Sequence, residues 1–144
     1  MEEITRRPAE EVLEEQGYIV DSVSGNSMYP TLREGTDTVL IKPADEILGK
    51  YDVILFRYND KLLLHRIIKA FPEGYITRGD NSAVKEKIPK EAVIGVLAEY
   101  QRGDSFYSTR NFSFRFRGAI TQYTFPLKSK LRKLKEKKIS KSDK

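Results

Sequence analysis

The sequence predicts a mostly β domain, either an antiparallel β-sandwich or a partly open barrel, with short helical or basic segments at its two ends. Short runs of alternating or β-branched residues recur between residues 18 and 102. Turn residues separate these runs at close intervals, as is typical of antiparallel strands. The 144 residues suffice for one domain with a modest core.

The individual elements follow from local patterns. A short helix is expected between Pro8, which suits a helix start, and Gly17, which suits a helix end. The residues "NDK" between two apolar runs predict a β-hairpin. The residues "SAVKEKIPKEA" read as a loop. The strands are expected at residues 18–25, 37–43, 52–58, 62–71, 73–81 and 93–102.

The pattern changes after about residue 104. Residues 106–117 mix aromatic residues with arginines and show no clean period, whereas Leu127, Leu131 and Leu134 recur at helical spacing among basic residues. We therefore divide the chain into an N-terminal helical segment (1–20), a β domain (21–126) and a basic C-terminal tail (127–144).

The charge is distributed unevenly. Residues 1–109 carry 14 Lys and Arg against 19 Asp and Glu, whereas residues 110–144 carry 12 against 2. A basic end of this kind predicts an anionic contact, and peripheral binding to an anionic membrane is the partner expected for the tail. Nucleic acid is not expected, because aromatic and arginine runs more often pack at a sheet edge.

Composition excludes several classes of function. The chain has no cysteine and one histidine, so neither a disulfide framework nor a metal centre is expected, and no cofactor is predicted. Its apolar runs are much shorter than the roughly 20 residues that cross a bilayer. The charged N-terminal residues do not resemble a secretory signal, so a cytoplasmic location is expected, with a peripheral membrane contact allowed by the tail.

Three short motifs carry the functional prediction. The segment Ser27-Met28-Tyr29-Pro30-Thr31-Leu32 resembles the nucleophile box of the signal peptidase I family, Ser-Met-x-Pro-Thr-Leu. Residues 49–54, "GKYDVI", resemble the second box, although two residues here separate its glycine from its aspartate. Residues 77–81, "TRGDN", resemble the Gly-Asp-Asn box. The resemblance covers about residues 22–98 and implies the β core of that family.

The single histidine lies where this family carries its general base. Most bacterial members have a lysine there, whereas His65, followed by Arg66, resembles the histidine-base branch. The chemistry agrees, because a serine hydroxyl needs a neighbouring base to take its proton. Histidine side chains titrate near pH 6.5 and can both accept and return that proton.

A carboxylate should orient the histidine, and the sequence offers two. Asp80 of the Gly-Asp-Asn box is the first choice, and Glu86 is the alternative, since the histidine branch carries a second acid a few residues later. The Ser27 backbone N–H is expected to bind the oxyanion, and Gly25 can add no side chain there. Met28 and Asn26 are expected to contact substrate.

The predicted function is therefore that of a serine endopeptidase that cleaves an extended leader or propeptide segment with a Ser27–His65 dyad or triad. A peptide or protein substrate is the expected partner. Self-cleaving repressors share the β fold but use a Ser–Lys pair, which His65 does not match. The alternative is an inactive module on the same fold that binds peptides or anionic membranes.

Overall fold

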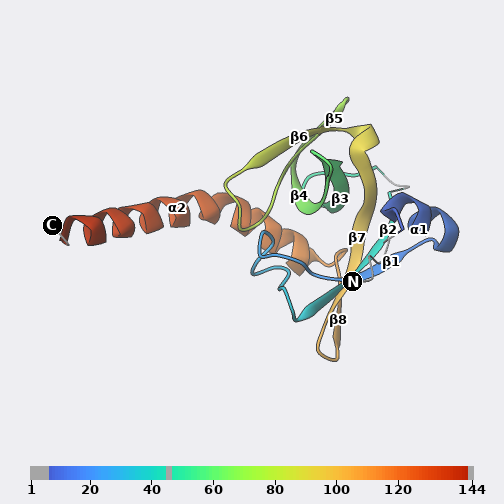
Figure 1. Ribbon diagram of the computed structural model, residues 1–144, viewed down its shortest axis with the longest axis horizontal. Coiled ribbons are helices and arrows are strands. Elements are labelled where there is room, and N and C mark those ends of the chain that lie inside the picture. Colours follow the sequence, from blue (N-terminus) through green and yellow to red (C-terminus); the bar gives the residue numbers. More distant parts are fainter. Residues whose placement is uncertain (1–6, 45–46, 143–144) are drawn as a thin grey trace, which may run out of the picture.

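The computed structural model describes residues 7–44 and 47–142, and within them the chain is mostly β. A strongly curved antiparallel sheet forms a half-barrel, with one short helix at the N-terminal side and one long helix at the C-terminal side (Figure 1). The elements are α1 (Ala9–Gln16), β1 (Ile19–Ser22), β2 (Asp37–Pro43), β3 (Val53–Tyr58), β4 (Lys61–Phe71), β5 (Gly74–Arg78), β6 (Lys85–Pro89), the 3-10 turn η1 (Lys90–Ala92), β7 (Val93–Arg102), β8 (Ser105–Ser108) and α2 (Phe112–Ser142).

The sheet order is β1-β2-β7-β3-β4-β5-β6, and β8 pairs with β7. The predicted hairpin is confirmed: β3 and β4 are adjacent, and His65 pairs with Ile54. Register shifts in the β2–β7, β3–β7 and β4–β5 pairs mark bulges, which increase the local twist and help a sheet to curl. The curvature leaves room inside the half-barrel for apolar side chains.

Two clusters of buried side chains form the core. One lies under the turn that follows β1 and includes Met28, Leu32 and Phe114. The other lies between β3, β4 and β5 and includes Ile54, Phe56 and Ile67. Because Phe114 belongs to α2, the start of the C-terminal helix is part of the domain core.

Two sequence-based expectations differ from the structure. Residues 85–89, expected in a loop, form β6, whose inward side chains are Glu86 and Ile88. The C-terminal helix begins at Phe112 instead of about residue 127, so the expected boundary after residue 126 falls inside α2. Helix α1 is confirmed, and Gly17 ends it with a φ of 80°. The first six residues of the expected helical segment lie outside the described residues.

The second half of α2 extends away from the domain as a long arm (Figure 1). Among residues 7–44 and 47–142, no helix is both long enough and apolar enough to cross a bilayer.

Candidate active site

Ser27 begins the turn that joins β1 to β2. The backbone N–H of Leu32 donates to the Met28 carbonyl at 2.9 Å, and that of Tyr29 donates to the Asn26 carbonyl at 3.1 Å. The Met28 and Leu32 side chains are buried and hold the turn against the core. Apolar anchors on the turn thus fix the backbone that carries the serine.

His65 lies in the middle of β4 with its imidazole directed at this turn. Its Nε2 atom is 3.1 Å from the Ser27 Oγ atom, within hydrogen-bonding distance. The ring of Phe56, on the neighbouring strand, meets the imidazole edge to face, with centroids 6.0 Å apart. Strand β4 and its neighbour β3 therefore fix the position of the histidine ring.

Glu86 of β6 contacts the other ring nitrogen of the histidine. Its Oε1 atom is 2.8 Å from His65 Nδ1, and its Oε2 atom accepts a hydrogen bond of 2.9 Å from the Thr77 hydroxyl. His65 is 6% exposed and Glu86 is 3% exposed. A carboxylate at Nδ1 favours the tautomer that has its hydrogen on that atom and leaves Nε2 free to accept a proton. Serine, imidazole and carboxylate thus form a continuous chain of hydrogen bonds.

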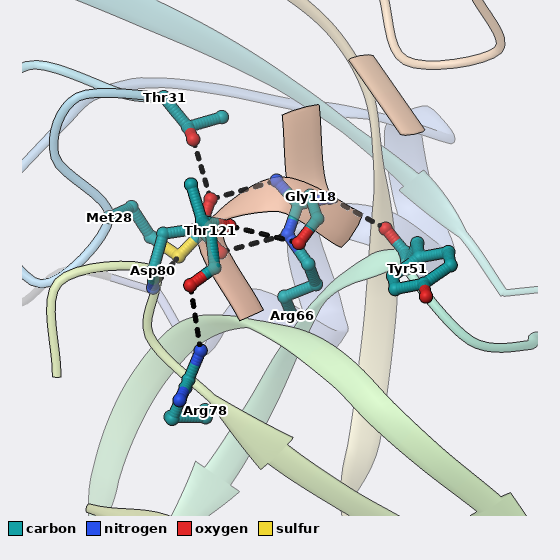
Figure 2. Close-up of polar contacts among 8 residues, drawn as sticks. All are labelled: Met28, Thr31, Tyr51, Arg66, Arg78, Asp80, Gly118 and Thr121. Atoms are coloured by element: carbon teal, nitrogen blue, oxygen red, sulfur yellow. Dashed lines mark hydrogen bonds and ion pairs between the residues drawn. The ribbon is translucent and has the colours of Figure 1, made fainter. Parts of the chain in front are cut away.

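Asp80, the first choice for the orienting acid, does not contact the histidine. Its two carboxylate oxygens accept hydrogen bonds of 2.8 Å each from Nε and Nη2 of Arg66, and the Thr31 hydroxyl also donates to it (Figure 2). Arg66 makes a third bond, from Nη1 to the Tyr51 carbonyl. Since these donors occupy the Asp80 carboxylate, the structure corrects the assignment: Glu86, the alternative from the sequence, is the acid beside His65.

The loop Gly79-Asp80-Asn81 holds the serine turn in place. The Asn81 backbone N–H donates to the Ser27 carbonyl at 2.7 Å, and the Asp80 N–H meets the Met28 sulfur at 3.4 Å. A Cβ on residue 79 would lie 2.5 Å from the Ser27 carbonyl oxygen and 3.1 Å from His65 Nε2. Only glycine permits this close approach, so the Gly-Asp-Asn motif acts as a clamp on Ser27.

The second motif also has a structural role. Asp52 accepts a bond of 2.8 Å from the Gly49 N–H, and its carbonyl accepts the Ile67 N–H. Tyr51 has a positive φ of 80° in the resulting turn. This turn presents the Tyr51 carbonyl to Arg66, and so supports the ion pair with Asp80.

Helix α2 covers the far side of the same ion pair. Phe114 lies against the Arg66 guanidinium, 4.8 Å from ring centroid to Cζ. Arg78 donates to the Thr121 carbonyl at 3.3 Å (Figure 2) and lies over the Phe125 ring. Burial lowers the pKa of Arg78, and the Asp80 charge partly offsets this effect. Sequence reasoning missed these contacts.

A cleft of about 350 Å³ opens beside Ser27 and His65. Most of its lining is apolar, and it includes Met28, one of the two residues expected to contact substrate, and Leu62–Leu64 of β4. Asn26, the other expected contact, does not line this cleft; its carbonyl instead binds the Asn81 side chain. The cleft therefore presents apolar side chains to any group beside the serine.

No cluster of metal-ligating side chains is found among the described residues. No protein-family model matches the chain, and no curated protein is significantly similar to it.

Proposed function

We propose that this protein is a serine endopeptidase that resembles signal peptidase I, with Ser27 as nucleophile, His65 as general base and Glu86 as orienting acid. The observation that carries the proposal is the position of His65, 3.1 Å from the Ser27 hydroxyl and 2.8 Å from the Glu86 carboxylate. Nucleophile, base and orienting acid in hydrogen-bonding contact are the signature of covalent acyl transfer.

In the proposed reaction, the Ser27 oxygen attacks a peptide carbonyl while its proton passes to His65 Nε2. The Ser27 backbone N–H is the expected donor to the oxyanion that forms. The imidazolium then gives its proton to the departing amine, which leaves an ester on the serine. Water hydrolyses this ester with the same histidine as base. Glu86 keeps the imidazole oriented and stabilises the imidazolium each time it forms.

The shape of the site supports an extended peptide as substrate. The catalytic atoms lie beside an apolar cleft, and a peptide strand can place alternate side chains in such a cleft. A flexible leader or propeptide segment meets this requirement, because a folded protein would have to unfold locally to enter.

Labelling with a fluorophosphonate probe tests the proposal without knowledge of the natural substrate. The wild-type protein should be labelled on one serine, and Ser27→Ala should abolish labelling while the fold is kept. Ser24→Ala is the matched control, because Ser24 also lines the cleft. Absence of labelling in folded wild-type protein would refute the enzyme and favour the inactive binding module.

A further inference from the structure

The long helix α2 carries an apolar stripe that the domain does not cover. Ile120, Tyr123, Leu127, Leu131 and Leu134 are spaced by three or four residues, so they lie on one face of the helix. Their exposed fractions range from 44% to 72%. The stripe continues the three leucines noted in the sequence towards the domain.

Basic residues flank this stripe on both sides. Within the described part of the arm, residues 127–142, eight Lys and Arg accompany a single acid, Glu136. At 3.6 residues per turn, these basic residues fall on two separate sides of the apolar stripe. One flank has Lys130, Lys133 and Lys137, and the other has Lys128, Arg132 and Lys135.

We propose that α2 is a membrane-surface helix that binds anionic phospholipid bilayers, a property beyond the proposed peptidase activity. An apolar stripe between basic flanks matches a bilayer surface, where leucines enter the acyl boundary and lysines meet anionic headgroups. A second copy fits less well, because its helix would bring the same positive charges to both flanks. Nucleic acid would engage the charges but leave the leucines exposed to water.

The first turns of α2 are packed against the domain. A bilayer that binds the arm would therefore also keep the candidate active site at the membrane. Phe114 is buried in the core, and Gly118 lies so close to Arg66 that a Cβ there would be 2.4 Å from its Nη1 atom. Further along, Arg78 donates to the Thr121 carbonyl at 3.3 Å (Figure 2). The helix thus leaves the domain in a defined direction.

Vesicle sedimentation with the full chain tests this proposal. Vesicles of phosphatidylcholine mixed with phosphatidylserine should bind the protein, with weaker binding at high salt, and phosphatidylcholine alone should not. Replacing Leu131 and Leu134 together by serine should weaken binding by about tenfold or more, because apolar burial is lost at constant charge. Ile139→Ser is the matched control: Ile139 is exposed on the same helix but lies off the stripe, so binding should stay within about twofold.

Three results would overturn the proposal. One is binding that is equal for neutral and anionic vesicles, or absent for both. Another is unchanged binding of the double-serine variant, which would show that the basic residues alone bind the vesicles. The leucines would then have no role, as expected for a helix that binds nucleic acid. The third is a concentration-dependent dimer that the double-serine variant loses. Ser27→Ala should bind vesicles as the wild type does, so the outcome is independent of catalysis.

Discussion

Replacing Glu86 by glutamine removes the charge beside His65 with little change in volume. The amide can keep the Thr77 contact through its oxygen and turn its NH₂ group towards His65 Nδ1. That arrangement favours the tautomer with its hydrogen on Nε2, which can no longer accept the serine proton. We therefore expect the rate of serine attack to fall by up to about 10⁴-fold, equivalent to about 5 kcal/mol in the barrier.

The same substitution should leave stability nearly unchanged. Hydrogen bonds of the neutral amide replace those of the carboxylate, so the free energy of unfolding should change by about 1 kcal/mol. Asp80→Asn should behave in the opposite way. This variant removes the charged partner of Arg66, and Arg66 is only 1% exposed. Loss of one partner of a buried ion pair lowers the free energy of unfolding by about 3 to 5 kcal/mol.

Two measurements separate the variants: the rate of fluorophosphonate labelling of folded protein, and the unfolding free energy from urea titration. We expect Glu86→Gln to lose labelling and keep stability, and Asp80→Asn to lose stability while its folded fraction is labelled much faster than Glu86→Gln. The reasoning is refuted if Glu86→Gln is labelled at the wild-type rate, or if folded Asp80→Asn is the less reactive of the two.

Two further predictions concern stability. Gly118→Ala should destabilise the protein by about 1 to 2 kcal/mol, since overpacking against Arg66 outweighs the better helix propensity of alanine. Gly49→Ala is the control and should leave stability unchanged, because a Cβ there meets nothing within 4 Å. Equal midpoints of urea unfolding for the two variants would contradict the prediction. Burial alone would raise the pKa of Asp37, but hydrogen bonds from Arg102 and a backbone N–H outweigh it and hold that pKa below its usual value. Because the folded-state pKa is depressed, this stabilisation is present above about pH 3.9 and is lost as the pH falls further. Asp37→Asn should therefore make the free energy of unfolding less dependent on pH in acid. An unchanged dependence would show that the Asp37–Arg102 pair is not its cause.

Patterns of alternation and turn chemistry predicted most of the sheet. The strand at residues 37–43 and the hairpin around "NDK" are confirmed, because one face of each strand is apolar and the turn residues are strong signals. Strand β6 was missed because one of its two inward positions holds Glu86. A charged residue in place of an apolar one hid the period of two, and its carboxylate contacts His65.

The start of α2 was missed for a related reason. Its inward positions hold Phe114, Gly118 and Phe125, which keep helical spacing, but a glycine and interspersed arginines obscure the pattern. Helical spacing of apolar residues is plain only in Leu127, Leu131 and Leu134, so the sequence predicted the helix from residue 127 onward. The glycine is required by the nearby Arg66 side chain, a contact that no local pattern encodes.

The sequence favoured Asp80 over Glu86 as the neighbour of His65 because both acids follow the histidine at plausible distances in the chain, whereas the structure places Glu86 there. Only the fold shows that Arg66, the residue next to His65, faces away from it and takes Asp80. Neighbouring residues on a strand point to opposite faces, so the acid that pairs with Arg66 cannot also serve the histidine.

The position of Glu86 on β6 affects how the candidate site is lost when the protein begins to unfold. Within the described residues β6 pairs only with β5, so it ends the sheet, and its outward residues Lys85, Lys87 and Pro89 are of the kinds that discourage further pairing. Terminal strands open locally at lower free energy than central ones. Detachment of this one strand would take the carboxylate from the imidazole while the rest of the half-barrel stays folded. Reactivity should therefore disappear at a lower urea concentration than the bulk of the sheet.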